Sequence, residues 1–321
     1  MLLVFYMLAL VTACGDSGDA DSNVKIEDLT DLTVTVIVPA VDTTWDTGVA
    51  YEAEARCQER QVTYNMVYAS TAEEMLAAFN QAAGQSADGS YNPAKDTAIV
   101  IYPQFEGLDT AIREAFTAGV NVVAFDCDLG TDDYCYVIGD NYALGTAAAD
   151  YMLETAGTEG KVLILSATDG GDSGDARVQG FMDRLDEIQQ NWTILTYATQ
   201  TGRGVAETDF GAILGTEAEL AGVYTTSDEI GIGVLAAIDN AGRTDIKTVI
   251  GCGGRQDYLA QIATHDSLEA ACMLYSPRMV SYAVDMAIDL MQGKDVEPEY
   301  VVPATVINKD NVAEYQNSSA F

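Results

Sequence analysis

The fold is decided by residues 120–145, VNVVAFDCDLGTDDYCYVIGDNYALG. The apolar, β-branched run 120–125 predicts a buried strand. Asp126 and Asp128 follow it directly, at the carboxyl end where open parallel sheets bind their ligands. A second short apolar run then leads to Asp140 and the start of a helix. We interpret the stretch as the wall of a ligand pocket, followed by a crossing from one sheet into another.

Predicted strands and helices alternate on both sides of this crossing. Before it, we expect strands at 33–39, 62–68, 97–102 and 120–125, and helices at 48–61, 71–83 and 108–118. After it, we expect strands at 161–166, 193–198, 222–225, 247–251 and 268–274, and helices at 142–155, 175–189, 206–214, 228–240, 256–264 and 279–292. An extended segment, 300–306, ends the series. This alternation is typical of an α/β protein whose parallel sheets are covered by helices on both faces.

The composition limits both the size of the core and the partners. A chain of 321 residues with 48% hydrophobic residues can form two medium-sized cores, so we expect two lobes. With 50 acidic and 15 basic residues, the net charge of −35 argues strongly against nucleic acids and anionic lipids, because little is present to neutralise phosphates. The acid excess fits either a cationic ligand or a heavily hydrated surface in a saline environment.

The N-terminus has the pattern of an export signal. Residues 1–13, MLLVFYMLALVTA, are apolar but too few to span a membrane, which takes about 20 apolar residues. The stretch VTAC resembles the bacterial lipobox, whose cysteine, here Cys14, carries the lipid. No Lys or Arg precedes the apolar run, so a start further upstream or an uncleaved apolar start stays open. We predict a signal peptide at 1–13, a lipid-anchored acidic tether at 14–30, and a location outside the cytoplasm.

Export makes the remaining cysteines candidates for disulfide bonds. Five follow Cys14, namely Cys57, Cys127, Cys135, Cys252 and Cys272. We expect Cys127 to pair with Cys135 across the loop after the key strand, and Cys252 to pair with Cys272 on two neighbouring strands. The chain contains no C-x-x-C motif, so the sequence gives little support to a thiol redox site or a zinc site.

Five short stretches carry a family resemblance when they are taken in order. They are VVAFDCD, IGDNYALG, DARVQGF, VYTTSDEIGIGVLAAI and TVIGCGG, and they lie between Leu32 and Val306. Their order and spacing resemble the type I periplasmic binding proteins for simple sugars, the ribose-binding-protein group. The resemblance implies two Rossmann-like, doubly wound lobes, a ligand in the cleft between them, and closure about a three-segment hinge. The three crossings are expected near Asp140, Tyr275 and Val301.

These crossings divide the chain into two lobes. The N-terminal lobe is expected to contain residues 31–139 and 276–300, with the helix after Pro277 returning to it. The C-terminal lobe is expected to contain residues 140–275 and 301–321.

The resemblance also implies a set of ligand-binding residues. Trp45, in the first strand–helix loop, stands where the family presents aromatic rings to the sugar, although a packing role is the alternative. Tyr102 occupies another lining position at the end of its strand. Asp126 matches the aspartate that accepts hydrogen bonds from sugar hydroxyls, and Arg177 matches the arginine from the second lobe. Together these two charges would form a clamp when the cleft closes.

Three further positions depart from the ribose-binding pattern. Ribose binders have an arginine directly after the pocket aspartate, whereas Asp126 is followed by Cys127 and Asp128, and this Asp-x-Asp resembles a sister group of sugar and autoinducer binders. Ser227 replaces an expected asparagine, and Cys252 stands where a phenylalanine–aspartate pair is expected. Tyr275 falls at the hinge-side ligand contact. These departures argue against ribose itself as the ligand.

The sequence gives little support to an enzyme. The stretch GIGVLA, 231–236, matches a dinucleotide-binding pattern, but it lies inside a predicted helix rather than in a strand–helix turn. His265 is the only histidine, and neither a G-x-S-x-G nor an H-E-x-x-H motif is present. The acidic stretch 169–175 fits a solvated turn better than a cation site. We therefore expect no catalysis, no cofactor and no metal.

The resemblance implies a monomeric, lipid-anchored binding protein outside the cytoplasm. It would capture a simple sugar or polyol and present the closed form to the permease of an ABC importer. The alternative is a receptor subunit, for a sugar or an autoinducer-like furanone, that passes the closed state to a membrane sensor. The fold is the same for both functions, so the sequence leaves this alternative open.

Overall fold

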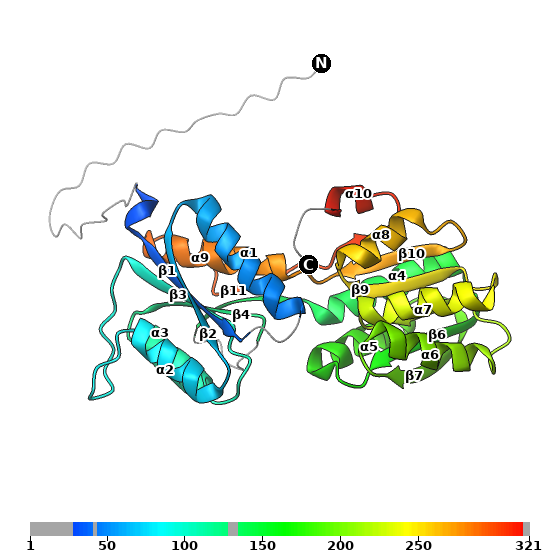
Figure 1. Ribbon diagram of the computed structural model, residues 1–321, viewed down its shortest axis with the longest axis horizontal. Coiled ribbons are helices and arrows are strands. Elements are labelled where there is room, and N and C mark those ends of the chain that lie inside the picture. Colours follow the sequence, from blue (N-terminus) through cyan, green and yellow to red (C-terminus); the bar gives the residue numbers. More distant parts are fainter. Residues whose placement is uncertain (1–27, 41–43, 128–133, 317–321) are drawn as a thin grey trace, which may run out of the picture.

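The computed structural model describes residues 28–40, 44–127 and 134–316, which form two α/β lobes lying side by side (Figure 1). Each lobe is built on a sheet of six strands. The first sheet has the order β11-β5-β4-β3-β1-β2, and all its strands run parallel. Its strands are β1 (Thr33–Pro39), β2 (Thr63–Ala69), β3 (Thr97–Ile101), β4 (Asn121–Phe125), β5 (Cys135–Gly139) and β11 (Glu299–Val302).

Helices cover both faces of the first sheet because its strands are apolar on both sides. Alternate residues of β3 show this: Ala98 and Val100 belong to the core under α1 (Thr44–Arg60) and α9 (Val280–Met291). Ile99 and Ile101 belong to the core on the opposite face, under α2 (Ala72–Ala82) and α3 (Asp109–Thr117). A short 3₁₀ turn, η1 (Leu29–Asp31), precedes β1.

The second sheet repeats this plan with the order β12-β10-β9-β8-β6-β7. Only the last strand, β12, runs antiparallel to its neighbour among the strands described. Its strands are β6 (Glu159–Ala167), β7 (Asn191–Thr199), β8 (Gly222–Thr225), β9 (Thr248–Gly253), β10 (Glu269–Leu274) and β12 (Val306–Ile307).

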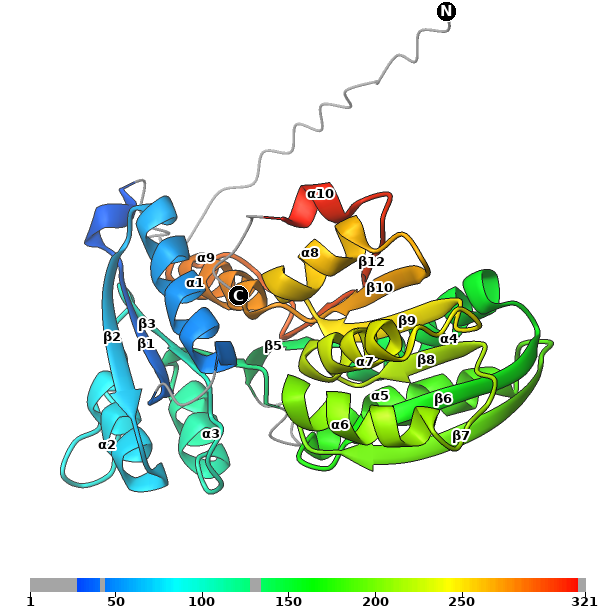
Figure 2. The same cartoon turned by 45° about the vertical axis from the view of Figure 1, so that its right-hand side comes forward.

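The faces of the second sheet are covered in the same way. Val162 and Ile164 of β6 pack towards α4 (Asn141–Ala156) and α5 (Gly171–Leu185). Leu163 and Leu165 belong to the core on the other face, whose helices α6 and α7 lie in front of the strands in Figure 2. The helices of that face are α6 (Arg203–Leu214), α7 (Asp228–Ala241), α8 (Gln256–Thr264) and α10 (Val312–Tyr315). The expectation of two doubly wound, parallel-sheet lobes is confirmed.

Within the described residues, the chain passes between the two sheets three times. It does so between β5 and α4, between β10 and the 3₁₀ turn η2 (Pro277–Met279), and between β11 and β12. The third passage follows Val302, one residue beyond the expected Val301, because β11 remains paired with β5 up to that residue. Pro303 then interrupts the extended segment expected at 300–306, since proline has no N–H to donate to a sheet.

The two expected disulfide bonds are not formed: Cys57, Cys127, Cys135, Cys252 and Cys272 are free thiols. Cys135 begins β5 opposite Val123, whereas Cys127 follows the far end of β4, so the pair is too widely separated along the strands. Cys272 of β10 pairs in register with Gly251, one position before Cys252. Because successive residues of a strand point to opposite faces, Cys252 and Cys272 lie on opposite sides of the sheet.

Candidate ligand-binding site

The site is centred on Asp126, the residue after β4. Its backbone N–H still donates to the carbonyl oxygen of Val137 in β5, at 2.9 Å, so the sheet fixes its position. Its φ angle of 66° lies in the left-handed region, which costs a residue with a β-carbon about 1–2 kcal/mol. Such strained residues concentrate at functional sites, because the surrounding structure has to hold them.

Tyr275 holds the carboxylate of Asp126. Its hydroxyl, from the second crossing, donates to Oδ1, and Tyr102 at the end of β3 lies close to the same carboxylate. Burial raises the pKa of Asp126 to about 6, although the hydrogen bond from Tyr275 and the positive charge of Arg177 act in the opposite direction. The group is therefore a desolvated carboxyl, and any additional hydrogen-bond donor or positive charge stabilises its charged form.

Arg177 of α5 reaches the same point from the other lobe. Its Nε donates to Oδ1 of Asn141 at 2.9 Å, and its Nη1 donates to the carbonyl oxygen of Thr226 at 2.8 Å. Its Cζ lies 4.9 Å from the centre of the Tyr275 ring, within the range of a cation–π contact. The guanidinium is thus oriented by the first crossing and by the loop after β8.

Trp45 completes the cluster from the N-terminal lobe. Its ring is stacked on that of Tyr275, with centroids 5.2 Å apart and planes inclined by 28°. It lies in the first turn of α1, because this helix begins at Thr44 rather than near Gly48 as the sequence predicted. Tyr102 packs edge-on against Phe125, with centroids 5.9 Å apart.

The structure therefore brings five of the predicted ligand-binding residues together. They are Trp45, Tyr102, Asp126, Arg177 and Tyr275. Ser227 lies beside Thr226 and accepts the backbone N–H of Ile230, so it caps helix α7. Asp128 and Cys14 lie outside the described residues.

The sequence interpretation missed two residues of the site. Asn141 accepts a hydrogen bond from Arg177 and lies close to the hydroxyl of Tyr275. Its place directly after the first crossing, in IGDNYALG, was the available signal. Asp46, next to Trp45, is 3% exposed and its charge raises the pKa of Asp126. Its place beside Trp45, in the stretch TWDTG, was the available signal for this residue.

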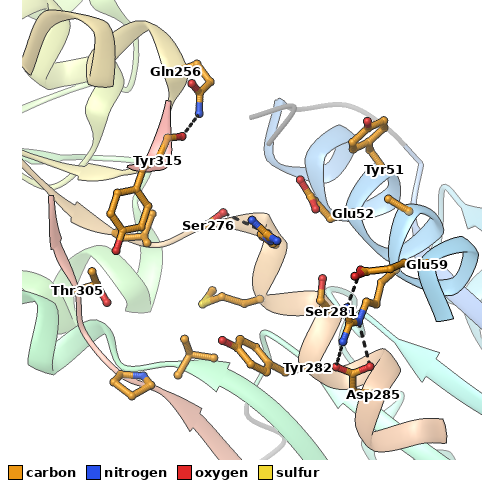
Figure 3. Close-up of a pocket in the computed structure, with 18 of the residues that line it drawn as sticks. Tyr51, Glu52, Glu59, Gln256, Ser276, Ser281, Tyr282, Asp285, Thr305 and Tyr315 are labelled. Carbon is orange, nitrogen blue, oxygen red and sulfur yellow. Dashed lines mark hydrogen bonds and ion pairs between the residues drawn. The ribbon is translucent and has the colours of Figure 1, made fainter. Parts of the chain in front are cut away.

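A cavity of about 780 Å³ lies on the opposite side of the second crossing (Figure 3). Leu274 and Ser276 line it, whereas Tyr275 between them points to the cluster around Asp126. Figure 3 shows Glu52 of α1 on one side of this cavity and Gln256 of α8 on the other. The extended segment 274–276 therefore separates the cavity from the candidate site.

Residues 28–40, 44–127 and 134–316 offer neither a cluster of metal ligands nor a membrane-spanning helix. No three His, Cys, Asp or Glu side chains gather there as a metal site. Asp169, from the acidic stretch considered for a cation, accepts hydrogen bonds from the backbone N–H and hydroxyl of Thr201. None of the helices in these ranges is long and apolar enough to cross a membrane.

Two curated relatives resemble the chain over more than half of its length. It is 27% identical over 239 residues to the xylitol-binding protein of Mycolicibacterium smegmatis, covering 70% of this chain and 64% of that protein. The chain thus spans slightly less than two thirds of that relative. It is 24% identical over 237 residues to the ribose import binding protein of Escherichia coli, covering 69% of this chain and 79% of that protein.

Solved structures share the arrangement of the two lobes. An ABC transporter solute-binding protein from Agrobacterium vitis with bound D-fucose superimposes with a TM-score of 0.66 at 25% identity, covering 87% of this chain and 96% of that chain. A periplasmic solute-binding protein from Actinobacillus succinogenes with bound D-allose gives a TM-score of 0.71 at 18% identity, covering 88% and 100%, which concerns the fold alone. The family model of the periplasmic binding protein domain matches residues 34–295 of the sequence. The chain therefore belongs to this family, as its motifs predicted.

Proposed function

We propose that the chain is the substrate-binding protein of an ABC importer and captures a simple sugar or polyol between its lobes. The observation that carries the proposal is that Asp126 and Arg177, on different lobes, approach the same aromatic ring, that of Tyr275. A carboxylate accepts hydrogen bonds from sugar hydroxyls, and a guanidinium donates them. The relatives are named for xylitol and ribose, which carry such hydroxyls.

Capture works by a shift in population between open and closed forms. Trp45 and Asp126 belong to the first lobe and Arg177 to the second. A ligand that contacts all three binds the closed form more tightly than the open form, and this difference in affinity drives closure. No bond of the ligand is broken in this process, so the function requires neither a nucleophile nor a cofactor.

The partner and the location follow from the same proposal. The closed form is presented to a membrane permease outside the cytoplasm, and Cys14 carries the lipid that holds the protein near it. An import role is favoured over a sensory role because the E. coli relative is named as an import protein. Mass spectrometry of the exported protein tests the anchor: a diacylglyceryl group on Cys14 is expected, and an intact Met1 would contradict it.

A ligand screen tests the function. The protein is titrated with D-ribose, D-allose, D-fucose, xylitol, a furanone autoinducer and amino acids, and its thermal unfolding is followed. A ligand at a hundred times its Kd stabilises the folded state by about 2.7 kcal/mol, which is visible as a raised Tm. A response to a sugar or polyol is expected. A response confined to amino acids or to the furanone would contradict the proposed class of ligand.

Two variants test the site. Asp126→Ala and Arg177→Ala should each weaken binding of the responding solute by about 2–5 kcal/mol, because each leaves a desolvated charge without its partner. Arg184→Ala is the matched control, since Arg184 lies on the same helix but pairs with Asp150 and Glu187 at the surface. Circular dichroism confirms that each variant is folded. Unchanged affinity in the Asp126 and Arg177 variants would place the ligand elsewhere.

A further inference from the structure

We propose that the ring of Tyr275 occupies the place of the ligand and is displaced when the sugar or polyol binds. This inference rests on the proposed function, because it concerns the same cleft. Tyr275 would then set the affinity of the site and the size of the solute that it admits. The contacts of the ring, the space made for it and the way its backbone is held all support this role.

The ring makes each kind of contact that the site offers to a sugar. Trp45 is stacked on the face of the Tyr275 ring, as it would stack on the apolar face of a sugar. Its hydroxyl donates to Asp126, as a sugar hydroxyl would. Arg177 lies 4.9 Å from its centre and approaches from the opposite lobe. Tyr275 is only 7% exposed, so one side chain fills the point where both lobes converge.

The first crossing leaves space for this ring. Gly139 ends β5, and a β-carbon there would overlap Cε2 of Tyr275 and stand 2.8 Å from its Cδ2. No other residue type could hold this position without moving the ring. Gly139, at the first crossing, therefore leaves the space that the ring of Tyr275, from the second crossing, fills.

The backbone and the side chain of Tyr275 are held by different groups. Its N–H donates to the carbonyl oxygen of Gly253 at 2.6 Å, and the N–H of Leu274 donates to Thr305 at 2.9 Å, so the segment is fixed by the second sheet. The ring instead contacts Trp45, Asp126 and Arg177, which are the proposed ligand contacts. A ligand can take over the contacts of the ring while the crossing stays intact.

Such competition predicts the direction in which the Kd changes when the ring is removed. When only a fraction of the protein has the ring displaced, the apparent Kd is the intrinsic Kd divided by that fraction. Removing the ring should therefore tighten binding and admit bulkier solutes. If Tyr275 is instead an ordinary ligand contact, removing it should weaken binding. The two interpretations thus predict opposite changes in Kd.

Calorimetric titration of Tyr275→Ala, Tyr275→Phe and the wild type with D-ribose, D-allose, D-fucose and xylitol separates them. We expect the Kd of Tyr275→Ala to fall about tenfold, and that of Tyr275→Phe to fall less, since it loses only the hydroxyl. Tyr282→Ala is the control, because Tyr282 is exposed and lines the cavity beyond the crossing. A raised Kd in Tyr275→Ala would overturn this proposal alone. Absence of binding by wild type and variants would overturn this proposal and the proposed function together.

A second measurement covers the case in which Tyr275→Ala fails to fold. With 3-fluorotyrosine incorporated at position 275 only, the ¹⁹F resonance reports the surroundings of the ring in the intact protein. Addition of the solute that binds the wild type should shift this resonance away from its ligand-free position. Calorimetric binding with an unchanged resonance would show that the ring stays in place and would overturn the proposal.

Discussion

The backbone carbonyl of Arg177 lies so close to Gly145 that a β-carbon on this glycine would overlap its oxygen. One turn further along α5, a β-carbon on Gly180 would overlap the carbonyl oxygen of Tyr142 in α4. The two helices therefore pack backbone to backbone. Helix α4 begins at the first crossing with Asn141, and α5 carries Arg177, so this packing sets the distance between a site residue and its hydrogen-bond partner.

Gly145→Ala tests this packing. The methyl group would force α5 away from α4 and move Arg177 relative to Asn141 and Tyr275. We expect a loss of about 1–3 kcal/mol in the free energy of unfolding, as for other overpacked positions, together with a raised Kd for the responding solute. Urea denaturation and calorimetric titration measure the two effects.

Gly174→Ala is the matched control for this variant. Gly174 lies on the same helix, but nothing stands within 4 Å of the position that its β-carbon would take. Alanine is the better helix former, so a gain of up to about 1 kcal/mol in stability and an unchanged Kd are expected. Equal behaviour of the Gly145 and Gly174 variants would show that close helix packing does not position Arg177.

The ligand-free protein should lose stability through Asp126 as the pH rises. Burial raises the pKa of its carboxyl to about 6, so between about pH 4 and pH 6 the folded state keeps a proton that the unfolded state has released. This group therefore contributes a stability that declines across that window and is lost above the folded pKa. The side chain of Asn cannot ionise, so Asp126→Asn should be more stable than the wild type at pH 7 by about 1–3 kcal/mol.

Urea denaturation of both proteins at pH 5 and pH 7.5 measures this difference. These conditions stay above the isoelectric point of about 4.1, where the chain has no net charge to keep it in solution. The advantage of Asp126→Asn should shrink at the lower pH. A difference that is the same at the two values would mean that the ionisation of Asp126 is not its cause.

Asp228 should be a structural carboxylate rather than a ligand contact. It is 1% exposed and accepts the backbone N–H groups of Gly254 at 2.6 Å and Arg255 at 2.9 Å, which fixes the loop after β9 to the start of α7. Asp228→Ala leaves two N–H groups without this acceptor, at about 1–3 kcal/mol each, so a loss of about 2–5 kcal/mol is expected.

Asp228→Asn separates the acceptor from the charge. The amide keeps one acceptor oxygen of similar shape, so we expect less than half of the loss seen with Ala. Denaturant unfolding of the two variants makes the comparison, and Ser227→Ala, which removes only the neighbouring helix cap, should cost about 1 kcal/mol. If the Ala and Asn variants at 228 are equally stable, the hydrogen bonds to the loop do not determine stability.

The order of strands and helices could be predicted because the central parallel strands are buried on both faces. Val120–Phe125 is an example: its β-branched residues Val120, Val122 and Val123 predicted the strand, and β4 occupies Asn121–Phe125. The start of α1 was misplaced because Gly48 is a poor helix former, whereas the helix already includes Thr44 and Trp45. Packing of Val49 and Ala53 against the sheet outweighs that local preference.

Five residues of the candidate site could be predicted, but its arrangement could not. Asp126 could be found because it follows the end of a parallel strand, and Arg177 because it lies in the motif DARVQGF. The central place of Tyr275 depends on which way one residue of an extended crossing points, and a shift of one residue reverses that direction. The same property made the disulfide prediction for Cys252 and Cys272 wrong, since strand neighbours can be predicted more readily than their register.

The free thiols give the last prediction. Burial raises the pKa of Cys57 and of Cys127 to about 12 and that of Cys252 to about 11, and alkylation requires the thiolate. Iodoacetamide should therefore modify none of the five cysteines quickly in the folded protein, with Cys127 the first to react because it alone is not fully buried.

After unfolding in urea without reductant, all five should react, and the Tm should be the same with and without dithiothreitol. A peptide linking Cys127 to Cys135, or Cys252 to Cys272, in the unreduced digest would contradict the structure. Such a link would require β4 and β5, or β9 and β10, to adopt a different register.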